Sequence, residues 1–299
     1  MSSLPKQWPL AGGKQPSRRR LFLRRALLVV LTLLLILGAD ALVRMHQAAD
    51  GIPVLNYHQI NDRDVNALTV RTDQFEAQMQ YLAEHGYHTI TPAELTDAWD
   101  NGTPLPDKPV IITFDDGYVD NYKNAYPILQ KYNLKATIFL VSDFLGTYPN
   151  YLTWDEAAEM QASGLIDFES HTLSHEELDK LSDEEMQHQL VDSKHALEWH
   201  LQKNIKYLAY PCGDYTQKVQ DATRDAGYRA AFTVHLGYAE KDKPQYKLDR
   251  VPIFGGTSHT LQRFKLRLKY APVFAPLEDF RLSLREHGFT WLAAHFNTP

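Results

Sequence analysis

Pro109-Val110-Ile111-Ile112-Thr113-Phe114-Asp115-Asp116-Gly117-Tyr118 joins an apolar run to two adjacent carboxylates. The apolar and β-branched residues are typical of a buried strand, and the Asp-Asp-Gly that follows is typical of the turn that ends it. Neighbouring side chains diverge at a strand end, so one carboxylate can bind a metal while the other faces an attacking water as general base. An ordinary turn without chemistry is the alternative for this segment taken alone.

A second motif, His171-Thr172-Leu173-Ser174-His175, lies further along the chain. Imidazoles four residues apart can meet on one helical face or across the turn that begins a helix. One carboxylate and two imidazoles around a divalent ion leave a position for water, whose pKa such an ion lowers towards about 7. The pair taken alone is more typical of a solvated helix face, but together with the two carboxylates it predicts a hydrolytic metal site.

Strand-like and helix-like segments alternate along the chain. Apolar or β-branched runs recur at 53–57, 87–90, 110–113, 136–141, 165–168, 207–210, 230–234 and 248–253, with helical patterns at 72–84, 121–132, 154–162, 183–200 and 217–226. This alternation predicts a mostly parallel sheet, and seven or eight units in one domain favour a distorted (β/α) barrel of about seven strands over an open sheet. Functional residues of such barrels lie where strands end, so the two motifs and Tyr210-Pro211-Cys212-Gly213 are expected on one rim.

The N-terminus carries a membrane-targeting pattern. Residues 1–25 contain seven basic residues and no acidic one, and an apolar run over 26–38 follows them. We interpret 1–25 as cytoplasmic, 26–43 as a single-pass signal anchor and 44–51 as a short linker. An extracytoplasmic catalytic domain over 52–269 and an extension of unknown role over 270–299 follow. Secretion after cleavage at the small-x-small site Ala39-Asp40-Ala41 is the alternative.

The part of the chain beyond this basic end is acidic. The whole sequence has 31 basic and 37 acidic residues, and without the seven N-terminal cations the balance is 24 to 37, or −13. Such a charge disfavours nucleic acid and anionic lipid as ligands and accommodates a neutral or cationic substrate. Cys212 is the single cysteine, which excludes an internal disulfide, and we expect an inert thiol there instead of a nucleophile.

The two motifs resemble the first and second motifs of the polysaccharide deacetylases of carbohydrate esterase family 4, a resemblance that extends over about 52–256. It implies a metal-dependent deacetylase with a distorted (β/α) barrel and one divalent ion, Zn²⁺ or else Co²⁺, Ni²⁺ or Fe²⁺. Carried over by position, it makes Asp115 the general base and Asp116, His171 and His175 the metal ligands.

Two segments depart from the family pattern. The third motif usually begins with an arginine that orients the base, whereas here it is Ala209-Tyr210-Pro211-Cys212-Gly213. Arg250 is the candidate replacement, because a guanidinium can hold a carboxylate through two hydrogen bonds. An exposed strand residue is the alternative for Arg250. The late Leu-x-His motif, which supplies the family's catalytic acid, is only approximated by Leu292-Ala293-Ala294-His295.

The opening Val54-Leu55-Asn56-Tyr57-His58-Gln59-Ile60 offers another source of the acid. A Tyr-His pair at the end of the first strand resembles the poly-β-1,6-N-acetylglucosamine deacetylases of biofilm exopolysaccharide systems, which resemble a circularly permuted family member. A barrel is closed, so its last strand can become its first without moving the side chain. His58 then takes the acid role, with Asp249 as a candidate carboxylate to tune its pKa.

The resemblance thus implies metal-dependent N-deacetylation of an extracellular N-acetylglucosamine polymer, with an exopolysaccharide synthase or export machinery as a further partner. A backbone N–H near Cys212-Gly213 is expected to stabilise the oxyanion. Four aromatic residues are candidates for stacking on sugar faces: Tyr118, Trp154, Tyr210 and Tyr215.

Two kinds of alternative remain. The same chemistry on chitin oligomers, peptidoglycan or acetylated xylan is opposed only by the Tyr57-His58 opening. A catalytically inactive sugar-binding scaffold is a different class of function. The second carboxylate beside the expected metal ligands argues against it, because a binding module has no need of a general base.

Overall fold

The computed structural model describes residues 18–48, 50–253 and 260–293. The chain divides into two compact units, Met1–His46 and Gln47–Pro299. The first unit contains one long helix, and the second contains every described strand.

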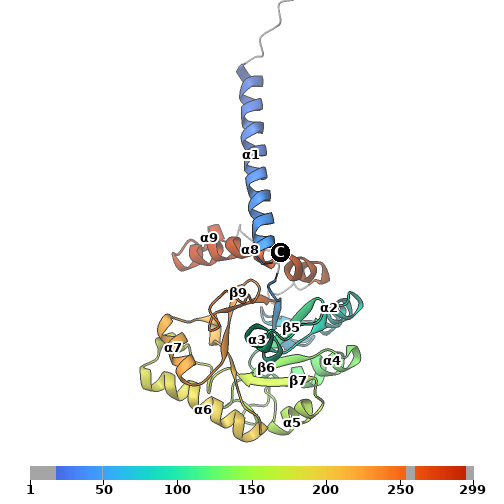
Figure 1. Cartoon of the computed structure of the whole chain (residues 1–299), viewed down its shortest axis with the longest axis vertical. Helices are drawn as coiled ribbons and strands as arrows, with labels where there is room; N and C mark the ends of the chain where they lie inside the picture. The colour runs from blue at the N-terminus through green and yellow to red at the C-terminus, as the bar shows by residue number, and fades with distance from the viewer. Residues whose placement is uncertain (1–17, 49, 254–259, 294–299) are drawn as a thin grey trace, which may run out of the picture. The chain divides into compact units, whose positions relative to one another are not determined.

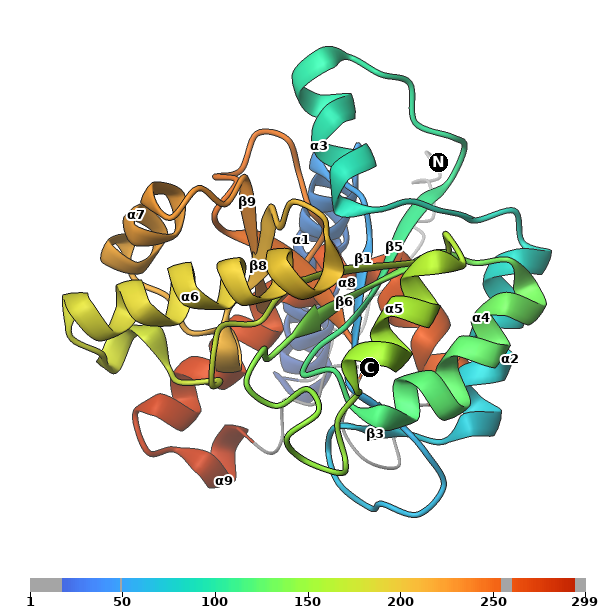
Figure 2. The ribbon, with the colours of Figure 1, turned by 90° about the horizontal axis from the view of Figure 1, so that it is seen from below.

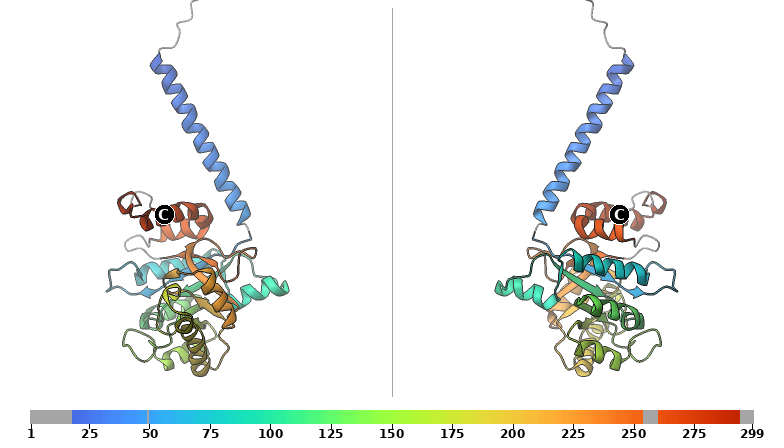
Figure 3. Two further views of the ribbon diagram at one scale, coloured as in Figure 1. Left: turned by 90° about the vertical axis from the view of Figure 1, so that its left-hand side faces the viewer. Right: turned by 90° about the vertical axis from the view of Figure 1, so that its right-hand side faces the viewer.

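Helix α1 (Arg18–Gln47) is longer than the anchor expected over 26–43. Its segment Phe22–Gln47 is long and apolar enough to cross a membrane, and none of its most apolar stretch is buried in the protein. Figure 3 shows it as one continuous helix. At 1.5 Å per residue, 26 residues reach about 39 Å, which exceeds the roughly 30 Å of a hydrocarbon core. Asp40 and Arg44 pair one turn apart within α1, and the helix extends to Gln47, so the first half of the expected 44–51 linker is helical.

Seven parallel strands form a closed barrel in the second unit, which confirms the predicted fold class (Figures 1 and 2). The first strand β1 closes the ring by pairing with both the last strand β10 and with β5. Around the ring the strands are β1 (Val54–Tyr57), β10 (Leu248–Pro252), β9 (Ala230–Leu236), β8 (Tyr207–Ala209), β7 (Ile166–Ser170), β6 (Ala136–Leu140) and β5 (Pro109–Phe114).

Several short elements lie outside this ring. Strand β4 (His88–Thr89) pairs with the start of β5 without joining the closed ring, although its sequence pattern resembled that of a barrel strand. Strands β2 (Gln59–Ile60) and β3 (Thr69–Val70) form a separate parallel pair. Three helical turns, η1 (Asn121–Ala125), η2 (Leu178–Lys180) and η3 (Pro211–Gly213), lie in the connections between strands and helices.

The helices cover the outside of the barrel (Figure 2). Threonine or serine side chains cap α5 and α6, each in a capping box with a glutamate three residues later, which satisfies the first free N–H groups of these helices. The bounds are α2 (Thr72–Glu84), α3 (Pro92–Asn101), α4 (Tyr126–Tyr132), α5 (Trp154–Ala162), α6 (Asp183–Leu201), α7 (Gln217–Asp225), α8 (Leu261–Glu286) and α9 (Thr290–Ala293).

The buried apolar residues form two clusters on opposite faces of the strands. The larger cluster packs strand residues such as Leu55 against the outer helices. The smaller one fills the barrel with side chains such as Val54 and Phe139, and Trp99 of α3 belongs to it. Successive residues of a strand point to opposite faces, so the next inward position of β1 after Val54 is polar Asn56. The barrel interior therefore changes from apolar to polar towards the carboxyl ends of the strands.

The C-terminal extension expected from residue 270 begins inside a helix. Helix α8 is kinked at Tyr270 and contains Pro272 and Pro276, which accounts for the missing periodicity in the sequence. Phe264 and Leu268 are buried, and the Leu268 carbonyl accepts a hydrogen bond of 2.7 Å from the Tyr238 hydroxyl. The first half of α8 is therefore part of the outer helical layer of the barrel.

Candidate active site

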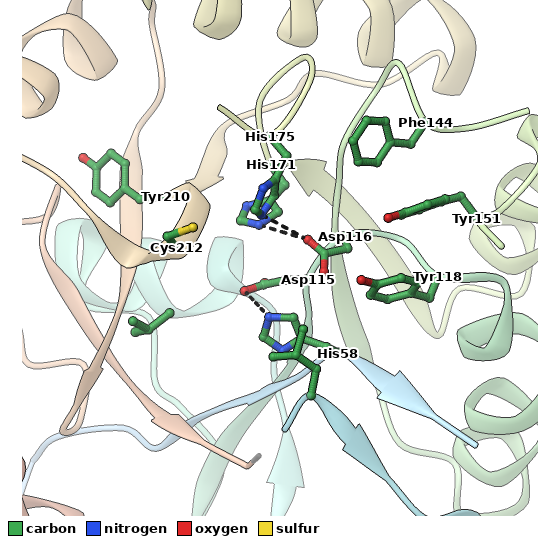
Figure 4. Close-up of a pocket in the computed structure, with 12 residues that line it drawn as sticks. His58, Asp115, Asp116, Tyr118, Phe144, Tyr151, His171, His175, Tyr210 and Cys212 are labelled. Carbon is green, nitrogen blue, oxygen red and sulfur yellow. Dashed lines mark ion pairs between the residues drawn. The ribbon is translucent and has the colours of Figure 1, made fainter. Parts of the chain in front are cut away.

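The carboxyl ends of the barrel strands bring the candidate residues to one pocket of about 360 Å³ (Figure 4). His58 follows β1, Asp115 and Asp116 follow β5, and His171 follows β7. The residues that line the pocket are His58, Leu68, Asp115, Asp116, Tyr118, Phe144, Tyr151, His171, His175, Tyr210, Cys212 and Val234. The convergence of separate strand ends on one rim is the arrangement that the sequence predicts.

The Asp-Asp-Gly turn sends its two carboxylates in different directions. Asp116 has a φ of 73° and Gly117 a φ of 79°, so two successive residues adopt the left-handed region. The φ of Gly117 favours glycine, and a Cβ atom there would also lie 2.6 Å from Cδ2 of Leu140, so the leucine side chain would have to shift. Aspartate is among the few side chains that tolerate this region without strong strain. The turn therefore separates two sequence neighbours into two distinct environments.

Asp116 faces both histidines of the second motif. Its Oδ1 lies 3.4 Å from Nε2 of His171 and 3.4 Å from Nε2 of His175. The three donor atoms lie within 4.8 Å of one another. Ligands of a tetrahedral ion at about 2.0–2.2 Å stand roughly 3.3–3.6 Å apart, so the two separations of 3.4 Å fit a divalent metal.

The surroundings of these donors also fit a cation. Among the residues that the structure describes, none makes a hydrogen bond of good geometry to the buried Oδ1 of Asp116. Nδ1 of His171 lies 2.8 Å from the Ala209 carbonyl, which accepts its proton and leaves Nε2 as a lone-pair donor towards Asp116. Such a partner for the second ring nitrogen is characteristic of metal-binding histidines.

The two histidines meet through a loop and not along a helix face. Thr172 has a φ of 68° and His175 a φ of 63°, and the His175 N–H donates to the Thr172 hydroxyl at 3.2 Å. The loop is held by Gln189 of α6, whose side-chain oxygen accepts from two loop N–H groups. The i, i+4 spacing thus reflects a compact loop whose two left-handed residues the sequence pattern did not reveal.

Asp115 is held by a buried guanidinium. Arg250 of β10 is completely buried and donates to Oδ1 and Oδ2 of Asp115 at 2.8 and 2.7 Å. Its Nε donates to the Thr233 carbonyl at 2.6 Å. Arg250 therefore occupies the place that we expected for the missing motif arginine, and it is not an exposed strand residue.

Asn56 is a second partner of Asp115 that the sequence analysis missed. Asn56 lies on the inward face of β1, and its side-chain amide donates a hydrogen bond of 2.9 Å to Oδ2 of Asp115. A polar residue within the apolar Val54-Leu55-Asn56-Tyr57 strand, two residues before His58, is the signal that could have indicated it.

These contacts keep Asp115 ionised. Burial by itself raises the pKa of Asp115, but the Arg250 guanidinium and the nearby imidazoles outweigh it, so the pKa lies well below its ordinary value. An ionised carboxylate with restricted orientation can accept a proton from a fixed direction, although the lowered pKa makes it a weaker base than an ordinary aspartate.

His58 lies beside Asp115, with Nε2 3.9 Å from Oδ2 of the carboxylate. Its backbone carbonyl accepts a hydrogen bond of 2.8 Å from the Asn121 side chain. Burial lowers the pKa of His58, and Asp115 and Asp116 offset this only in part. The rival acid, His295, lies outside the described residues.

The expectation that Asp249 tunes His58 is wrong. Asp249 pairs with Lys243 at 2.7 Å, and the carboxylates that act on the His58 pKa are Asp115 and Asp116. Asp249 and Arg250 are neighbours on β10, so their side chains point to opposite faces of the strand. Arg250 points into the barrel, and Asp249 therefore points away from it.

The third motif shapes one wall of the pocket. The Tyr210 hydroxyl donates to the Tyr246 carbonyl at 3.0 Å, and a Cβ atom on Gly213 would lie 2.2 Å from Cγ2 of Val234. The Gly213 N–H donates to the Tyr210 carbonyl at 2.9 Å, so it is already engaged and does not face an oxyanion. Burial and nearby carboxylates raise the pKa of Cys212, consistent with a thiol that stays protonated.

Only some of the expected aromatic residues reach the pocket. Tyr118 and Tyr210 line it, whereas Trp154 stacks on His200 and Tyr215 stacks on Tyr210 outside the lining. Two aromatic residues that the sequence analysis did not select, Phe144 and Tyr151, also line the pocket. They come from the long connection between β6 and α5, where no sequence periodicity indicates which side chains turn inwards. Figure 4 shows both on the same side of Asp116 as Tyr118.

Comparison with known proteins agrees with this geometry. Residues 102–231 match the family model described as polysaccharide deacetylase. The chain is 28% identical over 233 residues to the poly-β-1,6-N-acetyl-D-glucosamine N-deacetylase of Staphylococcus epidermidis, a match that covers 69% of this chain and 80% of that one. The solved structure of the Streptococcus pyogenes deacetylase PplD in complex with acetate is similar, with a TM-score of 0.65 and 31% identity over 68% of this chain and 92% of that chain.

A further relative has higher sequence identity. YxkH of Bacillus subtilis, which is assigned to the polysaccharide deacetylases, is 38% identical over 207 residues, 69% of this chain and 73% of the relative. The fold, the strand-end pocket and these similarities agree, and the chain belongs to the polysaccharide deacetylase family.

Proposed function

We propose that this deacetylase removes N-acetyl groups from an extracellular N-acetylglucosamine polymer, poly-β-1,6-N-acetylglucosamine in particular, and depends on one divalent metal ion. The observation that carries the catalytic part is the buried Asp115, held by Arg250 beside the Asp116, His171 and His175 cluster. The choice of polymer rests on the relative from Staphylococcus epidermidis and on His58 at the end of β1.

Asp116, His171 and His175 would hold the ion through one carboxylate oxygen and two imidazole nitrogens. Zn²⁺ suits this mixture of donors, and Co²⁺, Ni²⁺ and Fe²⁺ are alternatives. When bound, such an ion polarises a carbonyl and acidifies a water molecule.

Asp115 would act as the general base. It accepts a proton from the water whose oxygen attacks the acetamide carbon, and Arg250 and Asn56 keep the carboxylate oriented during the transfer. The Cys212 N–H is the remaining backbone donor of the third motif that could face the oxyanion, since the Gly213 N–H is engaged.

His58 would act as the general acid. When the C–N bond breaks, it protonates the departing nitrogen, so the products are acetate and a free glucosamine amine. A lowered pKa makes the imidazolium a stronger acid, although it also reduces the protonated fraction at neutral pH. The position of His58 directly after the first strand supports the circularly permuted order, in which the acid precedes the other motifs.

The enzyme acts outside the cytoplasmic membrane in this proposal. The basic residues of the segment 1–25 favour a cytoplasmic N-terminus, and the apolar Phe22–Gln47 segment is long enough to remain as an anchor. An exopolysaccharide synthase or export complex would deliver the polymer to the barrel.

The first prediction concerns activity and metal. The purified full chain should release acetate from poly-β-1,6-N-acetylglucosamine faster than from chitin oligomers or peptidoglycan, and it should contain about one divalent ion per chain. Chelation should abolish release, and added Zn²⁺ should restore it. Full activity in exhaustively metal-free protein would contradict the metal, and faster release from chitin or peptidoglycan would reassign the substrate.

The second prediction separates the two adjacent carboxylates. Asp115→Asn should reduce turnover by roughly 10²–10⁴-fold with metal content unchanged, because only the proton acceptor is lost. Asp116→Asn should reduce metal affinity as well, because it removes a donor atom. Elemental analysis and acetate release on both variants measure this difference. Loss of metal from the Asp115 variant alone would reverse the two roles.

The third prediction identifies the acid. His58→Ala should slow deacetylation of an amide by roughly 10²–10⁴-fold with metal content unchanged. The effect should be much smaller for an activated aryl acetate, whose leaving group needs no proton, and His295→Ala should be nearly silent for both substrates. An inactive His295 variant beside an active His58 variant would restore the ordinary family order.

The fourth prediction concerns location. A reporter fused after Pro299 should be active outside the cytoplasmic membrane, and the protein should fractionate with membranes because α1 stays attached. Sequencing of the mature N-terminus checks the anchor, and a chain that begins at Leu42 would show that it is cleaved.

A further inference from the structure

We infer that a second sugar unit of the polymer binds in a groove beside the catalytic pocket, against the ring of Tyr148, and that this contact makes the enzyme prefer a polymer to a single sugar. The inference rests on the proposed carbohydrate substrate, and it adds a binding site outside the residues that carry the reaction.

The groove is a second cavity of about 360 Å³ that shares Tyr151 with the catalytic pocket. It lies between η1, the connection from β6 to α5, and the first turn of α5. Its lining residues are Val119, Lys123, Gly146, Thr147, Tyr148, Pro149, Tyr151, Thr153 and Glu156. Because Tyr151 lines both cavities, the groove lies directly beside the catalytic pocket and within reach of the next unit of a polymer bound at Asp116.

Four aromatic rings connect the two cavities. Tyr118 stacks on Tyr151 with ring centroids 5.0 Å apart, and Phe144 lies 4.8 Å from the Tyr151 ring. Tyr148 continues the series, 5.3 Å from Phe144 and 6.2 Å from Tyr151. Three of these rings face the catalytic pocket, and Tyr148 faces only the groove with 51% of its surface exposed.

Backbone hydrogen bonds connect the groove to the turn that follows Asp115 and Asp116. The Leu152 N–H donates to the Gly117 carbonyl at 2.9 Å, and the Val119 N–H donates to the Asn150 carbonyl at 2.8 Å. These bonds tie the β6–α5 connection to the segment that carries Asp115 and Asp116. A preformed groove lowers the entropic cost of binding and holds the next sugar unit in register with the reacting one.

The lining chemistry suits a neutral, hydroxylated ring. Aromatic surface from Tyr148 and Tyr151 lies beside hydrogen-bonding groups of Lys123, Thr147 and Glu156. The charged lining residues are one lysine, Lys123, and one glutamate, Glu156, so the groove has no excess positive charge. A phosphate or nucleic acid ligand would require such an excess. An apolar face flanked by a few polar groups is the usual composition of a site for a sugar, which has one apolar ring face and polar edges.

The test compares Tyr148→Ala with the unmodified full chain on two substrates. One is a β-1,6-linked pentamer of N-acetylglucosamine, long enough to enter the groove, and the other is a small aryl acetate that fills only the catalytic pocket. Tyr148→Ala should raise KM for the pentamer about tenfold with little change in kcat, the effect of losing one aromatic contact. Turnover of the aryl acetate should be unchanged.

Two further variants serve as controls. Tyr148→Phe keeps the ring and should restore most of the pentamer affinity. Trp199→Ala removes an aromatic side chain of α6 that is 75% exposed and absent from both cavities, and it should change neither substrate.

The outcomes separate this inference from the proposed function. An unchanged KM for the pentamer in Tyr148→Ala, or an equal loss of activity on both substrates, would overturn the groove as a sugar site. If the unmodified protein releases no acetate from the pentamer or from any other polymer, the proposed substrate is wrong. Aryl acetate hydrolysis would then still report whether the catalytic pocket is intact.

Discussion

The buried pair between Arg250 and Asp115 is the interaction on which the rest of the site depends. Both side chains are almost completely inaccessible to solvent, and they come from β10 and β5. Loss of one partner from such a pair typically costs about 3–5 kcal/mol, because the other charge is left buried without compensation. The pair can form only when β1 lies between β5 and β10 and closes the barrel, so the orientation of the Asp115 carboxylate is linked to the closure of the fold.

The backbone at Asp116 separates two adjacent carboxylates into two environments. Asp115 continues the inward direction of β5 and meets Arg250, whereas the left-handed conformation of Asp116 and Gly117 turns the next carboxylate towards the histidines. Gly117 packs closely against Leu140 of β6, so the neighbouring strand also constrains this turn. The second histidine depends on similar geometry, since His175 is itself left-handed and hydrogen-bonded to Thr172.

The same turn also carries part of the aromatic wall of the pocket. Tyr118 follows Gly117 directly and stacks on Tyr151, whose connection is bound to the turn by main-chain hydrogen bonds. The proposed metal ligand Asp116 and part of the aromatic wall therefore share one segment, which is hydrogen-bonded to the β6–α5 connection.

The sequence by itself determined those features whose signal lies within a short stretch of consecutive residues. Alternating apolar segments predicted the barrel, and Asp115, Asp116, His171 and His175 were identified because their motifs lie just after strands. Arg250 was selected only as a replacement for a missing arginine, and its pairing with Asp115 across 135 residues needed the closed ring. Asn56, Phe144 and Tyr151 were missed, and the candidates Trp154, Tyr215 and Asp249 do not line the pocket, because the direction of a side chain depends on strand register and loop path. Local sequence patterns therefore identified the chemical groups. Contacts between distant strands and loops decided which of these groups meet.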